Sequence, residues 1–153
     1  MQFDMRELGL AERYKLMNST ITPRPIAWVT TRSKTGLVNA APYSFFNACG
    51  VEPPLVVLGL LKDFRTRERK DTATNIVETG EFVVNLVCEK DAETMNLSVS
   101  TRRATSARST TQASETAPSI VVAPPRIATS PVNLECRRLE ALGNRCAPDC
   151  RDR

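Results

Sequence analysis

Histidine is absent from this chain of 153 residues, and its absence excludes several kinds of chemistry. The protein lacks the commonest general base and the commonest metal ligand, and no Ser-His-Asp triad can form. The five cysteines include no Cys-x-x-Cys pair, and their odd number argues against a disulfide framework. Cys146 and Cys150 lie close together, but two thiols alone make a poor zinc site. We therefore expect neither a metal centre nor histidine-based catalysis.

Long apolar runs are missing as well. No stretch approaches the roughly 20 apolar residues that a membrane-spanning helix needs. The N-terminal residues lack the basic and then apolar pattern of a signal peptide. We expect a cytoplasmic protein with no membrane partner.

The second part of the chain lacks aromatic residues and lysines: the last aromatic residue is Phe82 and the last lysine is Lys90. Residues 1–97 hold 12 basic and 12 acidic residues, whereas residues 98–153 hold 9 arginines and 5 acidic residues. The second part therefore carries the whole net charge of +4. A nucleic-acid-binding surface needs clustered basic side chains, often with aromatic ones that stack on bases. The arginines here are scattered and no aromatic residue accompanies them, so we expect no nucleic-acid partner.

Short apolar segments bounded by turn residues predict a mostly β domain with a few short helices. The predicted strands cover residues 26–31, 37–41, 55–61 (buried), 81–87, 119–122 and 132–136, with a turn at 33–36. The predicted helices cover residues 71–79, with Asp71 as N-cap and Gly80 as the stop, and residues 89–97. Residues 5–16 fit either a short helix or an irregular segment, and residues 42–47 fit a ligand-facing loop or an irregular strand.

The common cofactor and nucleophile motifs GxGxxG, GxxxxGK[ST] and GxSxG are absent. Three other clusters stand out: Pro23-Arg-Pro-Ile-Ala-Trp-Val-Thr-Thr31, Asn39-Ala-Ala-Pro-Tyr-Ser-Phe-Phe-Asn47 and Arg65-Thr-Arg-Glu-Arg-Lys-Asp-Thr-Ala-Thr-Asn75. Taken singly, each also fits an ordinary structural role in a core, a charged loop or a helix cap. The third cluster runs into the predicted helix at residues 71–79, whose free N–H groups, with Lys70 and Thr72, form a natural anion site.

In this order and spacing the three clusters resemble the flavin reductase-like family of FMN-binding split barrels, over residues 14–88. Tyr14-Lys-Leu16, Glu52-Pro-Pro54 and Gly80-Glu-Phe-Val-Val-Asn-Leu86 also suit that family. The resemblance implies a Greek-key split β-barrel that forms a homodimer, with FMN in a groove at or near the subunit interface. It implies an oxidoreductase that passes electrons from NAD(P)H to flavin, or through flavin to an acceptor. The alternatives are a non-catalytic FMN-binding electron carrier and a defective family member.

The resemblance also assigns the cofactor-binding residues. Val29, Thr30 and Thr31 would line the isoalloxazine ring. The second cluster would contact the ring and ribityl chain through Asn39, Ala41, Pro42, Tyr43, Ser44, Phe45, Phe46 and Asn47. The third cluster would lie near the phosphate, through Lys70, Asp71 and Thr72. No residue is assigned to catalysis, because the cofactor carries the chemistry.

The family pattern is interrupted in the second half of the chain. We expect a flavin reductase-like domain over residues 1–140, an atypical and disordered segment at 98–117, and an atypical tail at 141–153. The barrel is then incomplete at its C-terminal end. One hypothesis is that residues 99–116 and 141–153 are frame-shifted sequence, which resequencing of the encoding DNA would test; the alternative is a natural disordered insertion and a shortened tail.

Overall fold

The computed structural model describes residues 2–63, 66, 68–100 and 115–142. Most of the segment expected to be disordered, and nearly all of the atypical tail, lie outside these residues, so both expectations stay predictions. At the ends of that segment, the structure shows a short 3₁₀ turn, η2 (Ser98–Ser100), and a short strand, β6 (Thr116–Ala117).

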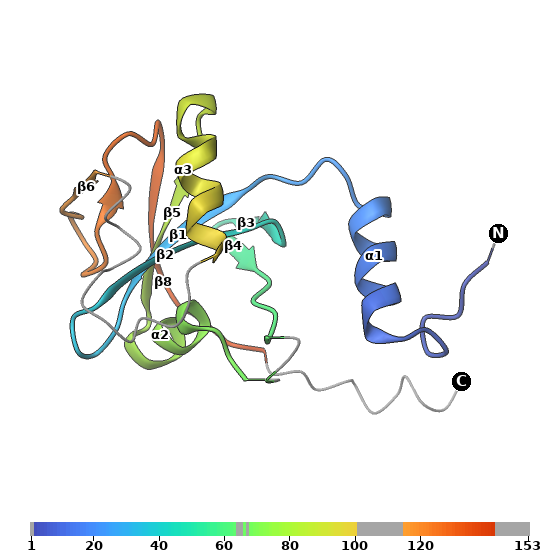
Figure 1. Cartoon of the computed structure of the whole chain (residues 1–153). Coiled ribbons are helices and arrows are strands. Elements are labelled where there is room, and N and C mark those ends of the chain that lie inside the picture. The colour runs from blue at the N-terminus through green and yellow to red at the C-terminus, as the bar shows by residue number, and fades with distance from the viewer. Residues whose placement is uncertain (1, 64–65, 67, 101–114, 143–153) are drawn as a thin grey trace.

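The centre of the molecule is an antiparallel sheet of four strands in the order β2-β1-β5-β8 (Figure 1). These strands are β1 (Ala27–Arg32), β2 (Val38–Tyr43), β5 (Glu81–Leu86) and β8 (Asn133–Arg137). The first two form the predicted hairpin, in which Ala27 faces Tyr43 and Arg32 faces Val38. Gly36 in the turn has a φ of 89°, and its N–H donates to the carbonyl of Ser33. A glycine adopts this left-handed conformation without steric cost. The φ of Gly36 and its hydrogen bond confirm the predicted turn.

A second hairpin pairs β3 (Phe46–Val51) with β4 (Pro54–Leu58). The sequence predicts a buried strand here, and the strand is present but only partly buried, with Val57 51% exposed. The prediction of burial is wrong because one side of β4 packs against the core, through Leu58, whereas Val57 on the other side is exposed. An apolar run predicts a strand, but it does not say what covers the strand.

Helix α2 (Asp71–Thr79) has the predicted bounds and ends at Gly80, whose φ is 76°. The predicted N-cap is wrong by one residue: Lys70 is the N-cap, with extended backbone, and Asp71 is the first helical residue. The predicted helix at 89–97 is a 3₁₀ turn, η1 (Glu89–Asp91), followed by α3 (Ala92–Leu97). Near the N-terminus, α1 (Leu10–Thr20) begins later than expected. None of the helices in the described part is long and apolar enough to cross a membrane.

The central sheet carries a small core on each face, because successive side chains of β1 point to opposite sides. On one face Ala27, Val29, Ile76 of α2, Phe82 and Val84 form a buried cluster. On the other face Trp28 and Ala40 pack with Ile127 of β7 (Arg126–Ile127), and Met95 of α3 covers them. The sheet is therefore enclosed by α2 on one side and by α3 and β7 on the other.

The segment between β6 and β7 corrects another prediction. Residues 120–124 form bends instead of the strand predicted at 119–122, and Ile120 is 89% exposed. The carboxylate of Glu135 on β8 accepts hydrogen bonds from the backbone N–H groups of Ile120 and Val121. A side chain thus takes the place of a strand partner for these donors.

Candidate functional site

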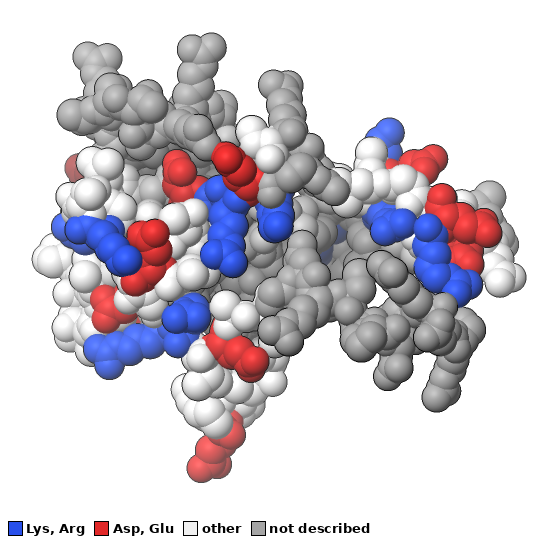
Figure 2. All heavy atoms as spheres, turned by 90° about the horizontal axis from the view of Figure 1, so that it is seen from below, with Lys and Arg blue, Asp and Glu red and all other residues white. Residues whose placement is uncertain are grey.

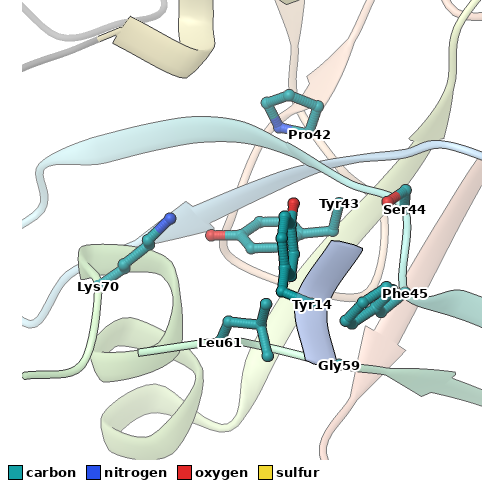
Figure 3. A pocket seen from close by; sticks show the side chains of 8 residues that line it. All are labelled: Tyr14, Pro42, Tyr43, Ser44, Phe45, Gly59, Leu61 and Lys70. Carbon is teal, nitrogen blue, oxygen red and sulfur yellow. The ribbon is translucent and has the colours of Figure 1, made fainter. Parts of the chain in front are cut away.

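A hollow of about 130 Å³ opens beside the end of β2 (Figure 3). Its walls come from α1, the end of β2, the link between β2 and β3, the segment after β4 and the residue before α2. The lining residues are Tyr14, Pro42, Tyr43, Ser44, Phe45, Gly59, Leu61 and Lys70. Three aromatic rings and one lysine therefore surround a single space built from segments far apart in the sequence.

Tyr43 forms one wall of the hollow, and its hydroxyl end points toward the side of Lys70 (Figure 3). Burial raises the pKa of the Tyr43 phenol above its ordinary value of 10.0, a side-chain hydrogen bond with Thr72 lowers it in part, and the charge of Asp71 raises it. The phenol is protonated near neutral pH, as an ordinary tyrosine is, and can donate a hydrogen bond.

The N-terminal end of α2 lies next to this wall. Lys70 makes no side-chain capping bond, and the first N–H groups of a helix have no partner within it. The hydroxyl of Thr72 accepts a hydrogen bond of 2.7 Å from the side-chain amide of Asn39, which ties the helix end to β2. Free N–H groups, the positive end of the helix dipole and an ammonium group favour an anion at this point.

The backbone of Gly59 lies directly against Phe45. The N–H of Gly59 donates to the carbonyl of Phe45 at 2.6 Å, and a Cβ atom at position 59 would stand 2.7 Å from the Cβ of Phe45. Real Cβ atoms do not approach this closely, so the glycine is needed for the two segments to meet.

The structure brings part of the predicted cofactor site together. Five of the fourteen predicted residues line the hollow: Pro42, Tyr43, Ser44, Phe45 and Lys70. Asn39, Asp71 and Thr72 adjoin it through the hydrogen bond and the helix end described above. Ala41 lies on β2 opposite Val29.

The other predicted residues lie elsewhere. Val29, Thr30 and Thr31 are completely buried within the chain, where Thr30 donates to the carbonyl of Pro125 and Thr31 accepts from Asn75. Phe46 packs against the core, and the exposed Asn47 accepts from the N–H of Ala48 through its side-chain oxygen. None of these five lines the hollow in the described structure, so their contact with a cofactor stays a prediction.

Three lining residues were not among the predicted site residues: Tyr14, Gly59 and Leu61. Tyr14 belongs to the family-like sequence but lies 28 positions before Pro42. A signal for Gly59 was present, because a glycine inside an apolar strand indicates a close approach of backbone. Nothing in the local sequence marks Leu61.

The described residues contain no group of three or more Cys, Asp or Glu side chains that could hold a metal ion. On the face shown in Figure 2, basic and acidic side chains lie interspersed, without a patch of one sign among the residues drawn in colour.

Comparison with known proteins identifies a family. The sequence model described as "Flavin reductase like domain" matches residues 17–145. An uncharacterised protein of Halalkalibacterium halodurans is 39% identical over 137 residues, which cover 90% of this chain and 65% of that protein. The chain thus spans slightly under two thirds of the length of this relative.

Solved structures show the same fold. Nitrilotriacetate monooxygenase component B from Bacillus cereus matches with a TM-score of 0.84 and 32% identity, over 94% of this chain and 71% of that one. A Shewanella frigidimarina protein described as having a split barrel domain matches with a TM-score of 0.67 and 20% identity, over 90% of this chain and 68% of that one. The predicted class, a mostly β split barrel with short helices, is confirmed.

Proposed function

Because the chain belongs to the flavin reductase-like family, we propose that it binds FMN in this hollow and serves as an oxidoreductase. In this proposal it passes electrons from NAD(P)H to flavin, or through flavin to an acceptor. The observation that carries the proposal is the meeting of Tyr14, Tyr43 and Phe45 with Lys70 and the start of α2 around one space.

The residues present fit the chemical character of a flavin nucleotide. Aromatic faces stack on a flat ring system, and they exclude water from it. Lys70 and the free N–H groups at the start of α2 suit a phosphate group. The protonated phenol of Tyr43 supplies a hydrogen-bond donor for a carbonyl or phosphate oxygen.

The size of the hollow supports a second part of the proposal. About 130 Å³ is less than the roughly 300 Å³ or more that ligand sites usually offer. One chain therefore encloses part of an FMN molecule, and we propose that a second copy completes the site in a homodimer.

The bound flavin would supply the redox chemistry, namely acceptance of hydride from a nicotinamide and transfer of electrons onward. The residues of this chain hold the ring, anchor the phosphate and keep water out. Because the flavin would carry the redox chemistry, the chain needs no histidine as an acid or base, and it has none.

Titration of FMN with the purified chain, followed by quenching of flavin fluorescence, tests the proposal. We expect saturable binding of one FMN per chain, weakened roughly ten-fold by Lys70→Ala because the phosphate loses a charged donor. Lys90→Ala is the matched control, since Lys90 lies in η1 and does not line the hollow. A folded, soluble sample without saturable binding contradicts the proposal.

NAD(P)H oxidation kinetics then separate an enzyme from an electron carrier. An enzyme oxidises NADH or NADPH in the presence of FMN with no other protein. A carrier does so only after a partner reductase is added.

A further inference from the structure

Helix α1 stands apart from the sheets in Figure 1, and none of its residues is buried. Its apolar residues Leu10, Tyr14 and Met17 recur at helical spacing, so they share one face. They are 46%, 42% and 41% exposed. The apolar face of α1 is therefore only partly covered, and Tyr14 lines the hollow.

Two contacts between the α1 region and the body of the protein meet at Phe45. The rings of Tyr14 and Phe45 have centroids 6.3 Å apart and are tilted by 54°. The guanidinium carbon of Arg24 lies 5.8 Å from the centroid of Phe45, within the range of a cation–π contact. Figure 3 shows Tyr14 and Phe45 on adjacent parts of the wall.

Arg24 also holds the C-terminal end of α1. Its Nη1 atom donates to the carbonyl of Asn18 at 2.8 Å and to the carbonyl of Ile21 at 2.7 Å. The last turn of α1 has no basic residue of its own, and its final carbonyls have no partners within the helix. A positive charge at this end also interacts favourably with the helix dipole. One side chain thus contacts both the helix end and the ring against which Tyr14 packs.

We propose that α1 is a lid on the hollow and that Arg24 is the positioning residue that latches it. The segment that links the lid to β1 contains Pro23 and Pro25, which restrict the backbone on both sides of Arg24. The Pro23-Arg24-Pro25 part of the first sequence cluster then has a role of its own, distinct from contact with flavin. The effect of the latch on ligand residence rests on the proposed FMN binding, whereas the attachment of α1 does not.

Hydrogen exchange of the ligand-free protein, read by mass spectrometry, tests the attachment of α1. In Arg24→Gln the side chain loses its charge, and we expect the peptides of α1 to exchange roughly ten-fold faster while those of β1 and β5 stay unchanged. Arg24→Lys keeps the positive charge and should restore much of the protection. Arg32→Gln is the matched control, since Arg32 donates to the carbonyl of Ala123 through its Nε atom.

The rate of FMN dissociation provides the second measurement. We expect it to rise roughly ten-fold in Arg24→Gln and to stay unchanged in Arg32→Gln, because an unlatched lid opens more often. A wild-type chain that binds no FMN overturns the proposed function, but the exchange experiment still decides on the latch. Unchanged exchange in α1, or equally faster exchange in every peptide, overturns the latch. Faster exchange in α1 without faster release of FMN overturns the lid.

Discussion

Asn85 offers the sharpest test of how the two halves of the chain are joined. It is fully buried on β5, and its amide donates to the carbonyl of Trp28 at 2.8 Å. Its side-chain oxygen accepts hydrogen bonds of 2.8 Å from the N–H of Ile127 and from the side chain of Asn133. A single side chain therefore connects β1, β7 and β8.

The change Asn85→Ala leaves the N–H of Ile127 buried without its acceptor, whereas Asn133 keeps a longer bond to the carbonyl of Ile127. An unpaired buried donor costs about 1–3 kcal/mol, and the removed side chain leaves a cavity besides. We expect the free energy of unfolding to fall by about 3 kcal/mol. For a domain of this size, that loss lowers Tm by roughly 6–12 °C.

Urea unfolding followed by tryptophan fluorescence measures this loss. Trp28 is the only tryptophan of the chain and is buried beside Asn85, so its emission reports on this part of the core. Asn96→Ala is the control, because Asn96 is exposed on α3 and its loss should change stability by less than about 0.5 kcal/mol. A loss of under about 1 kcal/mol in Asn85→Ala would refute the reasoning.

Two further changes test the hollow and the segment before β7. In Gly59→Ala the new methyl group collides with Phe45, so we expect a loss of roughly 1–3 kcal/mol in urea unfolding and weaker FMN binding; an unchanged protein would show that Phe45 can move aside. The N–H groups of Ile120 and Val121 lower the pKa of Glu135 from 4.5. Stability from this carboxylate is present above pH 4.5 and is lost as the pH falls through the lowered pKa. The protection of these two N–H groups from hydrogen exchange, measured by NMR, should therefore decrease as the pH is lowered below 4.5. Glu135→Gln should remove this pH dependence.

Some structural elements could be predicted because their signals are local. The strand at 26–31, the glycine turn and the helix at 71–79 depend on side-chain alternation, Gly36 and Gly80, which act over a few residues. Other predictions failed where the decisive partner is distant. Ile120, Val121 and Val122 are apolar and β-branched, yet Glu135 rather than a neighbouring strand accepts from the N–H groups of the first two.

The three sequence clusters indicated the family, and the match over residues 17–145 confirmed it. The site was predicted only in part. Pro42, Tyr43, Ser44, Phe45 and Lys70 line the hollow as predicted, whereas Tyr14 and Leu61 reach it through packing that no local pattern predicts. The cytoplasmic location, the homodimer and the contacts of Val29, Thr30 and Thr31 with flavin stay predictions.

The sequence by itself determined the type of most elements and the family. The periodicity, turn residues and clustered motifs that indicate them depend only on residues close together in the sequence. Only the tertiary structure decided which side chains share a space. Tyr14, Arg24, Phe45 and Gly59 come from four separate segments, and they meet because a glycine permits a close backbone approach and an arginine joins a helix end to a ring. Such contacts depend on the packing of the whole chain, so the local sequence does not determine them.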